Sequence, residues 1–75
     1  MKTLNMAKKN QICKIVGFVG ATDSVLRRFF ELGLLRGTTV KVVGSSLLRK
    51  VSLLEVRGYL LSVRTSLLEK IEVSA

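Results

Sequence analysis

Few side chains in this sequence are suited to acid–base catalysis, nucleophilic attack or metal binding. There is no histidine, which removes the commonest general base and the commonest transition-metal ligand. What remains is one thiol, Cys13, and five dispersed carboxylates, at Asp23, Glu31, Glu55, Glu69 and Glu72. No two of these groups have the spacing of metal ligands or of a paired catalytic dyad. We therefore expect no catalysis, no cofactor and no metal site, so the chain is predicted not to be an enzyme.

The lone cysteine and the glycines form no recognisable reactive motif. Without histidine, neither a Ser-His-Asp triad nor a Cys-His pair can form. Gly33 and Gly37 lie four residues apart, but the Gly-Lys-Ser/Thr of a phosphate-binding loop does not follow. A single cysteine permits no disulfide within the chain, which favours a reducing compartment. Cys13 is expected to be a small buried hydrophobe, although the adjacent Lys14 would favour a reactive thiol.

The net charge is high for a chain of 75 residues. Thirteen basic residues against five acidic ones give a formal charge of +8, which is spread along the chain. Such a charge favours nucleic acid, an anionic membrane surface or an acidic protein surface as a partner. No apolar run reaches the roughly 20 residues that span a bilayer, and no secretory signal is recognisable at the N-terminus. The chain is therefore expected to be cytoplasmic.

The first part of the chain is expected to contain a flexible segment, a strand and a helix. Residues 1–10 have no apolar period and are predicted to be a flexible N-terminus, which leaves residues 11–75 as the folded domain. The alternation from Gln11 to Phe18 predicts a strand that is partly apolar on both faces. The cluster at residues 22–24 can cap a helix that runs over residues 24–32.

The apolar stripe of this helix is expected to face the core. Val25, Phe29 and Leu32 recur at helical spacing. Leu26 and Phe30 widen the same stripe. The helix is therefore predicted to cover one open side of a β-structure.

Two glycines connect this helix to the next strand. Gly33 suits the left-handed conformation that commonly follows a helix, and Gly37 suits a tight turn. The alternation that follows predicts a strand over residues 38–43. Residues 44–50 are then expected to form a loop.

The clearest hairpin lies in the second half of the chain, around a turn at Arg57-Gly58. A two-residue turn there places Val56 opposite Tyr59, and the pairs further from the turn follow in order. Arg-Gly is not the ideal two-residue turn, so a bulged three-residue turn is the alternative. One face then collects only apolar side chains, those of Leu54, Val56, Tyr59, Leu61 and Val63. A slip of one residue would expose this apolar set to water, so the alternation specifies the register.

A short helical turn over residues 65–70 and a last strand over residues 71–73 complete the pattern. The order is then strand, helix, three strands, helical turn and strand. Five short strands in 75 residues, two of them in a twisted hairpin, favour closure into a small barrel. We predict a mainly β protein, a five-stranded barrel with one α-helix between the first two strands and a short helical turn before the last strand.

Several short segments resemble the ferrous iron transport protein A (FeoA) family. Each segment is weakly diagnostic by itself, and their order and spacing together make the resemblance specific. The matching residues are, in order, Ile15-Val16-Gly17; Arg28, Glu31-Leu32-Gly33-Leu34, Gly37, Val40 and Val42; Glu55-Val56-Arg57-Gly58-Tyr59 and Val63-Arg64; and Ile71-Glu72-Val73. One departure is Arg36, which precedes Gly37 at a place where the family often has proline.

The resemblance implies an SH3-like barrel over residues 11–75 that assists ferrous iron uptake without carrying the iron. The implied partner is FeoB, a membrane ferrous iron transporter with a cytosolic GTP-binding domain. By this resemblance, the chain binds the cytosolic part of the transporter and modulates its activity or assembly. The scarcity of metal-ligating side chains agrees with an accessory role.

Exposed positions are the candidates for contact with a partner. The loop Leu47-Leu48-Arg49-Lys50 would place an apolar anchor beside a basic rim, a composition typical of binding hot spots, unless one leucine packs into the end of the barrel. Arg27 and Arg28 on the helix are the next candidates, and the alternative is that they face solvent or pair with Glu31. Leu60, on the polar face of the hairpin, could pack under the helix or join a self-association patch.

Two further functions fit the charge of the chain. A small basic RNA-binding barrel would bind through phosphate contacts, but it would need exposed aromatic rings for base stacking. The chain has four aromatic residues, Phe18, Phe29, Phe30 and Tyr59. Three of them are expected to pack in the core or against loops, which leaves few rings for base stacking. A peripheral membrane module would need an apolar face beyond Leu47 and Leu48. RNA binding therefore stands as the alternative to an acidic protein partner, and membrane insertion is not expected.

Overall fold

The structure, a computed structural model, describes residues 2–46 and 48–74. These residues form six strands, one α-helix and two short 3-10 helices. In chain order the elements are β1 (Lys2–Thr3), η1 (Leu4–Met6), β2 (Ile12–Phe18), α1 (Asp23–Glu31), β3 (Thr39–Ser45), β4 (Val51–Val56), β5 (Tyr59–Arg64), η2 (Thr65–Lys70) and β6 (Ile71–Ser74). The prediction of a mainly β protein with one helix and a late helical turn is confirmed, with six strands in place of five.

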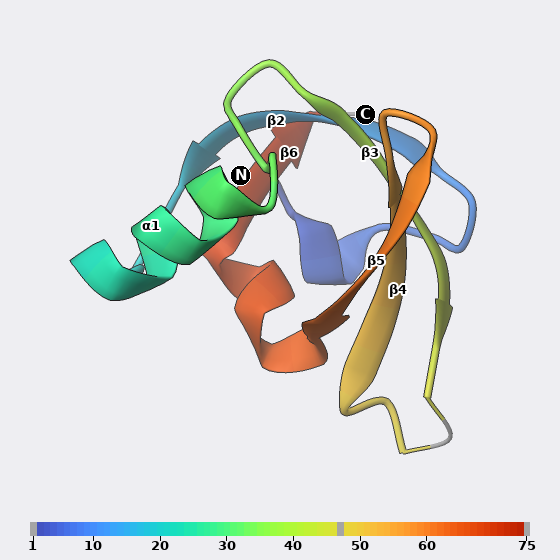
Figure 1. The fold of residues 1–75 in the computed structure, drawn as a ribbon. Helices are drawn as coiled ribbons and strands as arrows, with labels where there is room; N and C mark the ends of the chain where they lie inside the picture. Colours follow the sequence, from blue (N-terminus) through green and yellow to red (C-terminus); the bar gives the residue numbers. More distant parts are fainter. Residues whose placement is uncertain (1, 47, 75) are drawn as a thin grey trace.

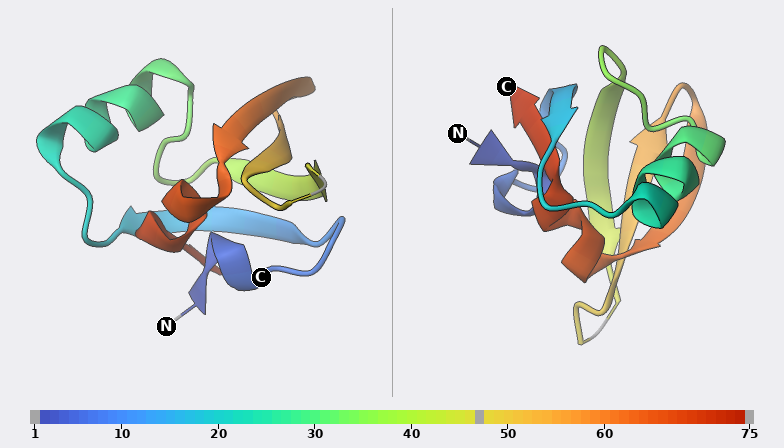
Figure 2. Two further views of the ribbon diagram at one scale, coloured as in Figure 1. Left: turned by 90° about the horizontal axis from the view of Figure 1, so that it is seen from below. Right: turned by 90° about the vertical axis from the view of Figure 1, so that its left-hand side faces the viewer.

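The strands form one antiparallel sheet in the order β1-β6-β2-β3-β4-β5 (Figure 1). Single-residue bulges at Val16 in β2 and at Val43 in β3 bend the sheet. The sheet therefore curls around its own inner face (Figure 2). The gap between the edge strands β1 and β5 is bridged by η2, which follows β5 directly and contacts both β1 and η1.

The core lies inside this curl. Alternation along β2 buries Cys13 and Ile15 and leaves Ile12 65% exposed, so the inward face of this strand is decided by the tertiary structure. The largest completely or almost completely buried side chains come from along the whole chain, namely Phe29, Leu4, Ile15, Leu34, Leu54, Ile71, Val40, Val56 and Cys13.

The N-terminus is built into the fold, which differs from the flexible segment predicted for residues 1–10. Lys2 and Thr3 pair with β6, and Leu4 is completely buried in the core. The backbone N–H of Asn10 donates to the carbonyl oxygen of Val42 at 2.7 Å. A two-residue strand is too short to show a period, and its partner is at the far end of the chain. The ordered domain therefore begins before residue 11.

Helix α1 begins and ends where the local chemistry requires. The Thr22 hydroxyl accepts a hydrogen bond from the backbone N–H of Val25 at 3.3 Å, which caps the first turn. At the other end, Gly33 has a φ of +81°, and the N–H of Leu34 donates back to the carbonyl of Phe29 at 2.9 Å. This left-handed termination is the one predicted from the glycine. The α1 helix has nine residues, and no helix in the described parts of the chain is long and apolar enough for a membrane span.

The α1 helix buries a narrower stripe than the sequence predicted. Phe29 is 1% exposed and stacks on Phe18 with a distance of 5.5 Å between ring centroids. Val25 and Leu32 are partly buried against the core. The prediction that Phe30 widens the buried stripe is wrong, because its side chain is 68% exposed. The helix meets the rest of the molecule along a narrow line, so the flank that carries Phe30 faces solvent.

The β4–β5 hairpin has the register predicted from the sequence. Val56 faces Tyr59 across the turn, and Arg57 and Gly58 have φ values of +50° and +85°, as a two-residue type I′ turn requires. Tyr59 departs from the predicted buried face, since it is 43% exposed. Its hydroxyl donates instead to the carbonyl oxygen of Leu32 at 2.6 Å and ties β5 to the end of α1.

Candidate partner-binding surface

The loop between β3 and β4 is closed by hydrogen bonds to Ser46. The Ser46 hydroxyl accepts hydrogen bonds from the backbone N–H groups of Lys50 at 3.1 Å and Val51 at 3.2 Å. The N–H of Arg49 donates to the carbonyl of Ser46 at 2.9 Å, and Arg49 itself has a left-handed φ of +56°. This turn holds Leu48 at the tip with 74% of its surface exposed. The predicted contact residue Leu47 lies outside the described residues.

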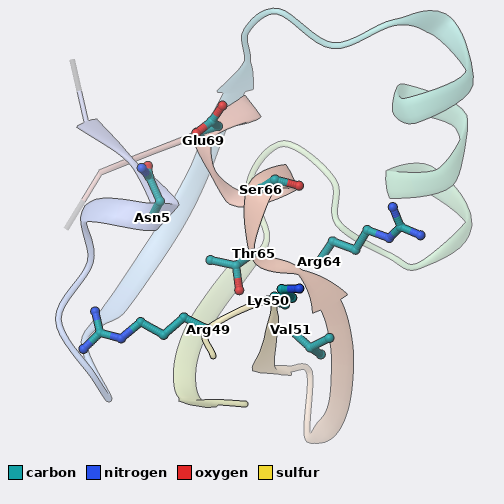
Figure 3. Close-up of a pocket in the computed structure, with 8 residues that line it drawn as sticks. All are labelled: Asn5, Arg49, Lys50, Val51, Arg64, Thr65, Ser66 and Glu69. Atoms are coloured by element: carbon teal, nitrogen blue, oxygen red, sulfur yellow. The ribbon is translucent and has the colours of Figure 1, made fainter. Parts of the chain in front are cut away.

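A groove of about 500 Å³ opens beside this loop, between the loop and η2 (Figure 3). Three of its lining side chains are cations, and one is an acid. The lining residues are Asn5, Arg49, Lys50, Val51, Arg64, Thr65, Ser66 and Glu69. Figure 3 shows the side chains of Arg49 and Arg64 pointing away from each other. The cations therefore form an extended basic surface and do not converge on one small anion.

We call Leu48, Arg49, Lys50 and Arg64 the loop surface. The loop is joined to η2 by the N–H of Thr65, which donates to the carbonyl of Lys50 at 2.9 Å. Leu48, Arg49 and Lys50 are exposed, so Leu48 takes the exposed one of the two placements that the sequence left open for the loop leucines. Arg64 was not among the predicted contact residues, although the predicted hairpin register, continued from the turn, places it opposite Val51 at the end of this loop.

The cations of the loop surface have no acidic partner among the described residues. The structure has one ion pair within residues 2–46 and 48–74, between Lys41 Nζ and Glu55 Oε1 at 3.2 Å. Arg27 and Arg28 are both exposed on α1, and neither pairs with Glu31. Much of the formal charge of +8 is therefore available to an acidic partner.

The two predicted helix arginines have different surroundings. Arg28 lines a second hollow of about 180 Å³ between α1 and β5, whereas Arg27 does not line it. The complete lining is Arg28, Leu32, Ser62, Val63, Arg64 and Leu67. Arg64 thus borders both hollows and links the basic groove beside the loop to the helix.

The one thiol of the chain, Cys13, lines neither of these hollows. Cys13 is 1% exposed, as the sequence predicted, and burial raises the pKa of its thiol despite an opposing effect from the charge of Lys2. Within the described residues, no three side chains of His, Cys, Asp or Glu come together in a way that could hold a metal ion. The arrangement is suited to binding through surface charge and one apolar anchor.

Comparisons with known proteins agree with this architecture. The FeoA domain matches residues 2–75 of the chain. An FeoA-like protein from Clostridium acetobutylicum is similar in structure, with 30% identity and a TM-score of 0.83 over 99% of this chain and 88% of that one. FeoA from Chlorobium tepidum is similar with 29% identity and a TM-score of 0.86, over 96% of this chain and 68% of that one. No curated protein matches the chain.

The SH3-like fold is also shared with a structure of Stenotrophomonas maltophilia FeoA complexed with zinc. That protein has 23% identity and a TM-score of 0.74, over 99% of this chain and 91% of that one. It is described as a procaryotic SH3 domain protein and as a candidate ferrous iron transport activating factor. The likeness confirms the SH3-like fold that the resemblance implied. The match of the FeoA domain over residues 2–75 shows that the chain belongs to the FeoA family.

Proposed function

We propose that this protein is a cytoplasmic, non-enzymatic accessory factor of ferrous iron uptake. In this proposal it binds the cytosolic part of a FeoB-type transporter and modulates the transporter's activity or assembly. Membership of the FeoA family supports the link to iron uptake, since one FeoA structure with this fold is described as an iron uptake regulatory protein. The observation that carries the binding mode is an exposed leucine, Leu48, beside cations that form no ion pair with any acid of the described residues.

The loop surface combines the two properties that a protein contact needs. Leu48 is 74% exposed and can enter an apolar pocket on the partner, where its burial removes apolar surface from water. Arg49, Lys50 and Arg64 surround it with positive charge, which speeds association with an acidic surface and orients the complex. The Ser46 hydroxyl accepts hydrogen bonds from the N–H groups of Lys50 and Val51, and these bonds would reduce the ordering entropy that the loop loses on binding.

Binding alone is sufficient to modulate a transporter. A rigid domain that contacts one conformation of the transporter better than another shifts the equilibrium between them by its difference in affinity. The protein therefore needs no catalytic group of its own. The same argument applies to assembly, where the domain would favour the associated form by binding it more tightly. In addition to the loop surface, Arg27 and Arg28 on α1 remain predicted contacts with the transporter.

The test is a matched pair of double variants. Leu48→Asp with Lys50→Glu changes the loop surface, and Ile12→Asp with Lys14→Glu makes the same chemical changes on the exposed face of β2. Affinity for a FeoB-type transporter in detergent or nanodiscs is measured by biolayer interferometry. We expect the loop variant to bind at least about tenfold more weakly, as loss of a hot spot requires, and the β2 variant to bind nearly as well as the native chain.

Two outcomes would contradict the proposal. Equal losses in the two variants would mean that net charge alone drives binding, without a defined loop contact. No binding to the transporter, together with salt-sensitive binding to single-stranded RNA, would favour the small RNA-binding barrel instead.

A further inference from the structure

The outer edge of β5 carries backbone groups that pair with no other backbone group within residues 2–46 and 48–74. β5 lies at one end of the sheet and pairs with β4 alone. Val56 and Tyr59 face each other across the two-residue turn, and in such a hairpin this pair exchanges both backbone hydrogen bonds. Alternation then directs the N–H and C=O groups of Leu60 and Ser62 away from β4. The N–H of Thr65 donates to the carbonyl of Lys50, the residue before β4, and this is the next bonded pair that the alternation requires.

The hollow between α1 and β5 lies against this same edge. We call it the α1–β5 groove, and its lining residues are Arg28, Leu32, Ser62, Val63, Arg64 and Leu67. Its apolar members are Leu32, Val63 and Leu67, which are buried or half-buried. The helix is held beside the start of β5 by the 2.6 Å hydrogen bond from the Tyr59 hydroxyl to the Leu32 carbonyl. A ligand in the groove therefore meets an apolar floor and the outer backbone of Ser62.

The groove has a cation on each of its two walls. Arg28 comes from α1, and Arg64 comes from the end of β5 and points toward α1 in Figure 3. Neither guanidinium forms an ion pair with any acid in residues 2–46 or 48–74. A second copy of this chain would bring another charge of +8 to the same place, which opposes self-association there. An acidic ligand is favoured by the same charges.

We propose that the α1–β5 groove binds an extended acidic peptide segment of a partner protein. The segment adds to β5 as a further strand, and it pairs its main chain with the outer groups of Leu60 and Ser62. Successive side chains of a strand point to opposite faces, so alternate residues of the segment reach the apolar floor and the others reach solvent and the rim. Carboxylates at the rim bind Arg28 and Arg64 in the planar, bidentate manner that guanidinium groups favour.

This proposal goes beyond a contact between the loop surface and a transporter, and it does not depend on that contact. It names a second surface and a different mode of recognition, in which main-chain hydrogen bonds supply affinity and two arginines supply selectivity. The loop variant Leu48→Asp leaves the groove untouched, because Leu48 does not line it. The two surfaces share Arg64, so variants at Leu48 and Ser62, each of which belongs to one surface alone, test them separately in one set of proteins.

The first measurement is an NMR titration of the full, isotope-labelled chain with a short synthetic peptide. The probe is a capped eight-residue peptide that alternates glutamate with valine or threonine, and the control peptide carries lysine in place of glutamate. We expect saturable shifts centred on the amides of Leu60, Ser62 and Arg64 and on the Arg28 turn of α1. The lysine peptide is expected to cause no such shifts.

Four variants separate strand addition from simple charge attraction. Arg28→Glu is expected to weaken binding of the acidic peptide at least tenfold, whereas Arg27→Glu, the same change on the next residue, is expected to weaken it less than threefold. Ser62→Pro removes an outward N–H that β4 does not use, which edge strands tolerate, and it is expected to abolish binding. Ser62→Ala keeps that N–H and is expected to bind normally. Amide dispersion in each spectrum reports whether the variant is folded.

Several results would overturn the proposal. Equal weakening of peptide binding by Arg27→Glu and Arg28→Glu would mean that net charge alone explains the binding. This comparison can be made even if Ser62→Pro does not fold. Peptide shifts centred on another part of the chain would reject the groove. Concentration-dependent dimers that Ser62→Pro abolishes would assign the edge to a second copy. Shifts of the same amides by oligouridine, without peptide binding, would assign the groove to nucleic acid.

Discussion

The β4–β5 hairpin and helix α1 are held in the molecule by different means. The hairpin contributes completely buried side chains such as Leu54 and Val56, and β4 is paired on both sides within the sheet. Helix α1 contributes one completely buried residue, Phe29, and a hydrogen bond from Tyr59 ties its end to β5. Elements with few buried contacts open locally at lower free energy than the core. We therefore expect α1 to open at a lower free energy than the hairpin. The loop surface adjoins the hairpin, and the α1–β5 groove lies between the hairpin and the helix.

The largest expected effect comes from removing a core side chain of the hairpin. Leu54→Ala should lower the free energy of unfolding by about 2–5 kcal/mol, because it leaves a cavity under a side chain that is 0% exposed. The matched control is Leu60→Ala on the paired strand, where the side chain is 60% exposed and a change within about 0.5 kcal/mol is expected. Chemical denaturation of both variants measures the difference. Similar losses in the two variants would contradict the buried face assigned to this hairpin.

A smaller effect is expected where the hairpin meets the helix. Gly33 and Gly58 have left-handed φ values of +81° and +85°, so alanine at either position should cost about 1–2 kcal/mol of backbone strain. A Cβ on Gly33 would also lie 2.8 Å from the Tyr59 hydroxyl, whereas a Cβ on Gly58 has no neighbour within 4 Å. Gly33→Ala should therefore destabilise more than Gly58→Ala, as measured by thermal unfolding. Equal destabilisation would mean that the contact between α1 and β5 adjusts freely.

The smallest effect is expected from removing one hydrogen bond between the two regions. Tyr59→Phe deletes the 2.6 Å bond to the Leu32 carbonyl and should cost about 0.5–1.5 kcal/mol. Amide hydrogen exchange locates this loss: exchange should accelerate in α1, while the inner amides of β4 stay protected. Uniform acceleration in both regions would show that the helix and the hairpin unfold as one unit.

Part of the candidate site was predictable because local chemistry decides it. The exposure of Leu48, Arg49 and Lys50 follows from a polar loop between two strands, and the structure places these three residues on one surface. The position of Arg64 beside the loop follows from the hairpin register, which pairs it with Val51, but the grooves that it lines depend on how η2 crosses between the sheet edges. For the same reason, the sequence did not distinguish Arg28, which lines a groove, from Arg27, which does not.

The sequence by itself determined the structural elements that depend only on residues close to one another in the chain. The alternating apolar set on either side of Arg57-Gly58 specifies the hairpin register, and Gly33 ends the helix because few other residues accept its φ. Only the tertiary structure decided that Leu4 joins the core, that Phe30 faces solvent, and that a groove opens between α1 and β5. These features depend on contacts between segments far apart in the chain. A short strand or a narrow helix interface leaves no periodic pattern from which such contacts can be foreseen.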